Sequence, residues 1–168
     1  MADDNKWLIG IDIDGTLVHD DGYLSENVLA QINRVRDLGH HVFVATGRAA
    51  SNAYPVIKQL GIDTGHAVCS NGAVTIKLDG VHPKGFSIHD IKTFDPADVL
   101  ARLIDTVPNA HFAVEDLDGG YRFNKPFPSY ALGDQNVETP LEELLHHPVS
   151  RAVSSSHPTL PTNRRVVS

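Results

Sequence analysis

Two aspartates, Asp12 and Asp14, follow a short hydrophobic run and are separated by a single residue. Carboxylates this close repel each other, so burying them together is unfavourable unless a cation or hydrogen-bond donors compensate. Gly15 follows directly and allows a sharp turn, which can bring backbone N–H groups close to an anion. Asp-Gly is also common in plain turns. We favour a metal site over a plain turn, because a cation offsets the repulsion between the carboxylates.

Polar groups also follow the next two hydrophobic runs of the chain. The second run leads into Ala45-Thr46-Gly47-Arg48, and the third leads into Ser70-Asn71-Gly72-Ala73. A hydroxyl, a glycine amide and a guanidinium can all donate hydrogen bonds to phosphate oxygens. Each motif alone is weak, since a strand-to-helix turn explains it as well. Polar groups at three successive strand ends, however, indicate one shared site that suits a phosphoryl group.

The residues between these motifs predict alternating strands and helices. The expected elements are strands over 7–11, 41–45 and 67–69 and helices from the Ser25 cap to Gly39 and from Ala50 to Leu60. The first strand is apolar throughout, which is typical of a strand buried on both faces. Strands joined by helices form right-handed βαβ units and a parallel sheet, which binds ligands at the carboxyl ends of its strands.

The second half of the chain follows a different pattern. Asp79-Gly80 and Asp118-Gly119-Gly120 lie between apolar segments and predict β-hairpins. Asp95-Pro96 predicts the start of one helix, and Thr139-Pro140-Leu141-Glu142 the start of another. Residues 154–168 have neither a helical nor a strand period, which favours a disordered tail. The second half therefore predicts a small antiparallel α+β unit.

Composition limits the class of protein. The 168 residues contain 14 Lys and Arg against 21 Asp and Glu, a net charge of −7, which argues against a nucleic-acid-binding protein. No apolar run is long enough for a membrane span, and the acidic start Met1-Ala2-Asp3-Asp4 is unlike a secretory signal. A single cysteine, Cys69, excludes an internal disulfide. We expect a cytoplasmic protein.

The order and spacing of the motifs from Asp12 to Ala73 resemble the haloacid dehalogenase (HAD) superfamily, specifically its Cof-type sugar-phosphatase branch. The motifs that carry the resemblance are Asp12-Ile13-Asp14-Gly15-Thr16-Leu17, Ala45-Thr46-Gly47-Arg48 and Ser70-Asn71-Gly72-Ala73. The resemblance implies an α/β fold with a Rossmann-like core and parallel sheet over 1–84, of which only the N-terminal half is present. It also implies a partial α+β cap over 85–153, followed by the tail.

The same resemblance implies magnesium-dependent hydrolysis of a small phosphorylated metabolite, such as a sugar phosphate. Asp12 would be the nucleophile that forms an aspartyl-phosphate, and Asp14 would be the acid/base. Magnesium would be bound by the Asp12 carboxylate and the Asp14 main-chain carbonyl. The implied phosphate-binding residues are Gly15, Thr46 and Gly47, with Arg48 and Asn71 close to the substrate.

The HAD pattern also requires a lysine and a second acidic motif after the cap. Lys125 and Asp134 are poor matches, because Asp134 does not follow a buried strand. We therefore expect a chain that is truncated relative to the family. Three functions stay open: a magnesium-dependent phosphatase whose activity truncation could abolish, a compact uncapped phosphatase active as an oligomer, and an inactive remnant that binds phosphate or a partner chain. An exposed sheet edge would permit self-association.

Overall fold

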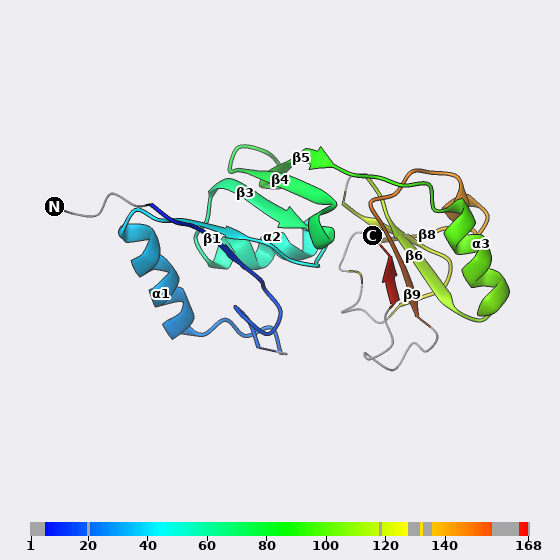
Figure 1. Ribbon diagram of the computed structural model, residues 1–168, viewed down its shortest axis with the longest axis horizontal. Coiled ribbons are helices and arrows are strands. Elements are labelled where there is room, and N and C mark those ends of the chain that lie inside the picture. Colours follow the sequence, from blue (N-terminus) through cyan, green and yellow to red (C-terminus); the bar gives the residue numbers. More distant parts are fainter. Residues whose placement is uncertain are drawn as a thin grey trace. The chain divides into compact units, whose positions relative to one another are not determined.

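The structure is a computed structural model that describes residues 6–19, 21–117, 119–127, 132 and 136–155, and the backbone of 165–167 (Figure 1). The chain divides into two units. The first unit comprises Met1–Arg48 and Ala53–His89, and the second comprises Ala49–Asn52 and Asp90–Ser168.

The strands of the first unit bring three carboxyl ends together. Strand β1 (Leu8–Ile11) pairs in parallel with β2 (His41–Val44). Strands β3 (Thr64–Cys69), β4 (Val74–Asp79) and β5 (Phe86–Ile91) form a second sheet, in which β3 and β4 are antiparallel. A parallel bridge between Ala45 and Val68 joins the end of β2 to β3. The expected parallel arrangement of the first three strands is confirmed.

The two helices of the βαβ units lie where local signals predict them. Helix α1 (Glu26–Asp37) is capped by Ser25, whose Oγ accepts a hydrogen bond of 3.2 Å from Val28 N–H. Gly39 follows the helix with a φ of +85°, a left-handed conformation that glycine adopts without strain. Helix α2 (Ala50–Gln59) matches the second expected helix.

The burial of β1 differs from the expectation. Trp7 is 65% exposed and Leu8 is 72% exposed, so the prediction of a strand buried on both faces is wrong at this end. The physical reason is the place of the strand in the sheet. Within the described part of the chain, β1 pairs with β2 and no other strand, so it lies at a sheet edge.

The second unit is an α+β unit built on five strands in the order β10-β9-β6-β7-β8. The strands are β6 (His111–Glu115), β7 (Tyr121–Phe123), β8 (Asn136–Glu138), β9 (Arg151–Ser155) and β10 (Arg165–Val167). Helix α3 (Ala97–Thr106) packs on one face, where Leu100 joins Phe112 and Val114 in an apolar cluster (Figure 1). Asp95 Oδ1 accepts a hydrogen bond from Ala97 N–H at the start of this helix, as its position predicts.

Two expectations for the second half are corrected. The segment after Thr139 forms only the short 3₁₀ helix η2 (Glu143–Leu145). The predicted disordered tail is wrong at Ser154 and Ser155, which belong to β9, and at β10, which pairs antiparallel with β9. Backbone hydrogen bonds between strands need no local apolar period, so the sequence pattern does not predict this pairing. Residues 156–164 and 168 lie outside the described residues.

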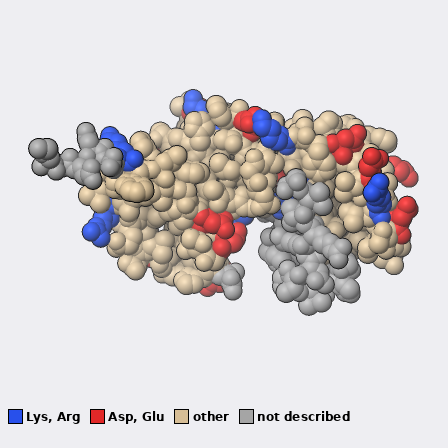
Figure 2. Space-filling model, in the orientation of Figure 1, with Lys and Arg blue, Asp and Glu red and all other residues tan. Residues whose placement is uncertain are grey.

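The surface and the helix lengths bear on the type of protein. On the face shown in Figure 2, the basic and acidic side chains of the described residues lie in small groups among uncharged atoms. Among the described residues, no helix has the length and apolar character that crossing a membrane requires.

Candidate active site

Four of the residues predicted for the site line one groove of about 410 Å³ in the first unit. They are Asp12, which follows β1, Thr46 and Gly47, which follow β2, and Asn71, which follows β3. Ala45, Val68 and Gly72 complete the lining. The groove lies at the carboxyl edge of the strands, where ligands bind in open α/β sheets.

Asp12 lines the groove and comes directly before a turn that starts at Ile13. Its Oδ1 accepts a hydrogen bond of 2.7 Å from Ile13 N–H, and within the described residues its Oδ2 accepts none. Leu17 and Val18 both donate to Ile13 O at 3.0 Å, which closes the turn. Asp12 therefore keeps one carboxylate oxygen available for a ligand.

Gly15 shapes this turn. Its φ is +72°, and its N–H donates to Val18 O at 3.1 Å. The predicted binding of phosphate by this N–H would require that hydrogen bond to open. This hydrogen bond and the one from Val18 N–H to Ile13 O together form a backbone bridge between Asp14 and Val18.

The Thr46–Arg48 loop lines the groove with Thr46, which carries a hydroxyl, and with Gly47, which has no side chain. Thr46 is buried, and its Oγ1 accepts a 3.2 Å hydrogen bond from Arg48 N–H, which leaves the hydroxyl hydrogen to be donated elsewhere. At Gly47, a Cβ atom would stand 2.8 Å from Asn71 Oδ1. A side chain at this position would therefore force the Asn71 side chain to shift from its present place.

Arg48 and Asp14 form a bidentate ion pair. Arg48 Nη2 lies 2.6 Å from Asp14 Oδ1, and Arg48 Nε lies 2.9 Å from Oδ2. The hydrogen bond to Asp14 raises the pKa of Arg48, the charges of Asp14 and Asp12 raise it further, and burial acts in the opposite direction. The pair stabilises the ionised carboxylate of Asp14. The sequence motif predicts that Arg48 lies near the substrate, but it does not predict this pairing.

The turn after β3 has an unusual backbone. Ser70 and Asn71 have φ values of +52° and +56°, and Gly72 has +96°. The N–H groups of Ser70 and Asn71 donate to Arg48 O at 2.8 Å and to Thr46 O at 3.2 Å. Ser70 is fully buried and Gly72 lines the groove. The Ser-Asn-Gly motif was the available signal for both residues, although its backbone conformation is not readable from sequence.

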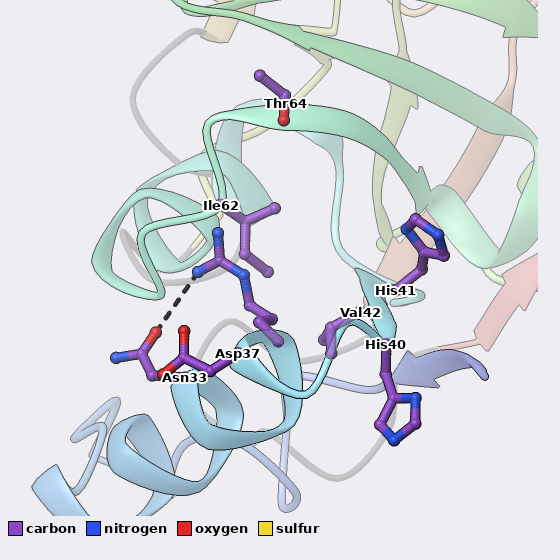
Figure 3. A pocket seen from close by; sticks show the side chains of 8 residues that line it. Asn33, Asp37, His40, His41, Val42, Ile62 and Thr64 are labelled. Atoms are coloured by element: carbon purple, nitrogen blue, oxygen red, sulfur yellow. Dashed lines mark hydrogen bonds between the residues drawn. The ribbon is translucent and has the colours of Figure 1, made fainter. Parts of the chain in front are cut away.

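A second groove, of about 550 Å³, lies at the opposite, amino-terminal end of β2 (Figure 3). Its lining residues are Asn33, Arg36, Asp37, His40, His41, Val42, Ile62 and Thr64. Figure 3 shows the side chains of His40 and His41 extending in different directions, and Arg36 Nη1 donates to Asn33 Oδ1 at 3.4 Å. None of the predicted site residues lines this groove. We therefore take the smaller groove, which unites four of them, as the candidate active site.

The donor set at the candidate site suits magnesium in part. Mg²⁺ usually binds one or two protein carboxylates and keeps several water ligands. Asp12 offers a carboxylate oxygen, and a main-chain carbonyl ligand at Asp14 would leave the carboxylate of Asp14 to Arg48. Among the described residues, no group of three His, Cys, Asp or Glu side chains could hold a metal ion. The described residues thus fit a magnesium ion held mainly by water and two aspartates.

The two residues rejected as further motif members are accounted for separately. Lys125 belongs to the second unit, where its Nζ donates to Asn109 O at 3.4 Å. Asp134 lies outside the described residues.

Comparison with known proteins defines the family. The sequence profile of the haloacid dehalogenase-like hydrolases matches residues 9–158. The chain belongs to this family, and the resemblance drawn from its motifs is confirmed. The mixed α/β fold expected from that resemblance is confirmed as well, because solved structures of haloacid dehalogenase-like hydrolases match 88–89% of the chain.

The relatives with known names or structures are longer than this chain. The chain is 37% identical over 99 residues to 5-amino-6-(5-phospho-D-ribitylamino)uracil phosphatase YitU of Bacillus subtilis, a match that covers 59% of this chain and 34% of YitU. A haloacid dehalogenase-like hydrolase from Bacteroides thetaiotaomicron matches with a TM-score of 0.68 and 16% identity, over 89% of this chain and 58% of that one. The sugar phosphatase BT4131, of HAD subclass IIB, matches with a TM-score of 0.66 and 18% identity, over the same shares. The chain therefore spans about a third of the curated relative and less than two thirds of these structures.

Proposed function

We propose that this chain carries the nucleophile, acid/base and phosphate-binding parts of a phosphomonoesterase site that acts on a small phosphorylated metabolite. The observation that carries this proposal is the groove that unites Asp12, Thr46, Gly47 and Asn71 beside the Arg48–Asp14 pair. The phosphatase names of YitU and BT4131 support it, and BT4131 points to a sugar phosphate as the substrate class.

In the first step, a carboxylate oxygen of Asp12 attacks the phosphorus atom of the ester. The bond from phosphorus to the ester oxygen breaks, and an aspartyl-phosphate forms. The leaving alkoxide takes a proton from Asp14, which must be protonated at this stage. The Thr46 hydroxyl and the Gly47 N–H would donate to the phosphoryl oxygens, where charge develops in the transition state.

In the second step, water attacks the phosphorus atom of the aspartyl-phosphate. Asp14 accepts a proton from this water, phosphate leaves, and Asp12 is regenerated. The pairing of Asp14 with Arg48 favours the ionised carboxylate, which suits this base role. Release of Asp14 from Arg48 would favour the protonated form that the first step needs.

Magnesium would be held by the Asp12 carboxylate and the Asp14 main-chain carbonyl. When bound, it would supply positive charge that offsets the repulsion between the Asp12 carboxylate and the phosphate ester. The ion pair of Arg48 and Asp14 joins two side chains of this chain, and neither of these groups is a proposed magnesium ligand.

The direct test is hydrolysis of a generic aryl phosphate by the purified chain, with and without magnesium. We expect metal-dependent turnover that Asp12→Asn lowers by several orders of magnitude, because the nucleophile is lost. Asp37→Asn is the matched control, since it changes an exposed carboxylate that lines the other groove. No turnover by the folded wild-type chain, or equal turnover by Asp12→Asn, would refute the proposal.

A second candidate function is phosphate or partner binding without turnover. It is favoured by the incomplete donor set, because among the described residues that line the groove Asp12 alone carries a carboxylate, and the carboxylate of Asp14 is paired with Arg48. Phosphate binding by a folded chain that fails to hydrolyse the aryl phosphate would support this alternative.

Self-association is a further proposal for the first unit. The exposed Trp7 and Leu8 lie at the edge strand β1, and edge strands readily pair with other chains. A cytoplasmic location stays a prediction from the sequence.

A further inference from the structure

The turn at Ser70–Gly72 combines an unfavourable backbone with two hydrogen bonds to the Thr46–Arg48 loop. Ser70 and Asn71 are the only residues other than glycine with a positive φ in the described part of the chain. The left-handed conformation is unfavourable for residues with a Cβ atom, although asparagine tolerates it better than most. Such residues persist where the surrounding structure forces them, and they cluster at functional sites.

The hydrogen bonds of this turn lead to the ion pair. Ser70 N–H donates to Arg48 O at 2.8 Å, and Arg48 holds Asp14 through its guanidinium. Asn71 N–H donates to Thr46 O at 3.2 Å, at the start of the same loop. Two consecutive residues therefore hold both ends of the Thr46–Arg48 loop, and both need the left-handed conformation to do so.

We propose that Ser70 and Asn71 are positioning residues, whose left-handed turn fixes the Thr46–Arg48 loop and thereby aims the Arg48 guanidinium at Asp14. The role belongs to their backbone conformation, which distinguishes it from a contact between the Asn71 amide and a substrate. Any effect of this positioning on turnover rests on the proposed function, whereas the positioning of Arg48 by Ser70 and Asn71 does not depend on it.

The test compares Asn71→Gly with Asn71→Ala. Both variants remove the side-chain amide, and Asn71 is exposed, so neither change disturbs the core. Glycine adopts the left-handed conformation freely, whereas alanine does so at a cost that corresponds to about a fivefold to thirtyfold change in population. We expect the amide hydrogens of residues 70 and 71 to exchange with solvent about fivefold to thirtyfold faster in Asn71→Ala than in Asn71→Gly. Ser70→Gly and Ser70→Ala form a second pair with the same expected order.

A spectroscopic measurement separates positioning from a merely structural role. The Arg48 Nε–H signal, identified by its loss in Arg48→Lys, should lose protection from exchange in Asn71→Ala and keep it in Asn71→Gly. Ser25→Ala, which weakens the distant cap of α1, controls for general destabilisation and should leave these signals unchanged.

Three outcomes would overturn the inference: equal exchange in the glycine and alanine variants, faster exchange of the backbone amides without any change at Arg48 Nε–H, and equal acceleration in Ser25→Ala. None of these measurements requires turnover. A chain that follows the expected exchange pattern but fails to hydrolyse the aryl phosphate would therefore leave the positioning role intact and refute only the proposed function.

Discussion

The packing of Gly47 against Asn71 offers a quantitative test of the candidate site. In Gly47→Ala, the new Cβ would stand 2.8 Å from Asn71 Oδ1, about 0.6 Å closer than the 3.4 Å at which ordinary contact begins. Asn71 Oδ1 is the far end of an exposed side chain, so it can move away at low cost. We expect the free energy of unfolding to fall by less than about 1 kcal/mol.

The effect on ligand binding should be larger than the effect on stability. Both residues line the groove, and misplacement by about 1 Å can lower an enzyme's rate about a hundredfold. A shift of about half that size should weaken phosphate binding about tenfold, and should lower kcat/KM for an aryl phosphate by a similar factor. Phosphate binding can be measured by titration followed through the backbone amide signals of the groove.

A double-mutant cycle identifies the cause. In the Asn71→Gly background the clashing oxygen is absent, so Gly47→Ala should have almost no further effect on phosphate binding. Gly80→Ala is the matched control, because a Cβ there meets nothing within 4 Å. An equal tenfold loss from Gly47→Ala in both backgrounds would refute the reasoning, since the loss could then not come from the Asn71 contact.

Four further predictions concern stability and association. Ser25→Ala should lower the free energy of unfolding by about 1 kcal/mol in urea titrations, because the N-cap hydrogen bond of α1 is lost. Leu100→Ala should cost about 2–5 kcal/mol, because this side chain of α3 is fully buried against Phe112 and Val114, and an unchanged urea midpoint would contradict that packing. Leu8→Lys should reduce self-association in sedimentation velocity experiments, because a charged side chain blocks edge-strand pairing, and wild-type chain that sediments as a monomer would contradict the proposed association. Asp14 raises the pKa of Arg48, so from neutral pH up to the pKa of an unfolded arginine the contribution of the pair is constant, and it is lost as the pH rises through the folded value. The stability difference between wild type and Arg48→Gln should therefore be equal at about pH 7 and about pH 9.

Several elements were predictable because their signals are local. The Ser25 cap and the glycine stop at Gly39 mark the ends of α1 within a few residues of the helix itself. The same holds for the hairpin between β6 and β7, whose turn contains consecutive glycines. The meeting of three strand ends was predictable as well, because βαβ units place the carboxyl ends of parallel strands at one edge.

The exposure of β1 at a sheet edge and the pairing of β10 with β9 were not predictable from local signals. An apolar strand such as β1 is typical of a buried position, and only the sheet order shows that Leu8 is exposed. Strand β10 has no clear apolar period, and its pairing with β9 depends on backbone hydrogen bonds across a long connection. Local composition carries no information on such partners.

The sequence by itself determined the family, the α/β architecture and the residue types at the candidate site. Only the tertiary structure decided how those residues are used. It pairs Arg48 with Asp14, fits Asn71 against Gly47 and holds Ser70 in a left-handed conformation. The physical reason is that motifs follow from local chain geometry, whereas these contacts join residues from three strand ends, which come together only when the sheet forms.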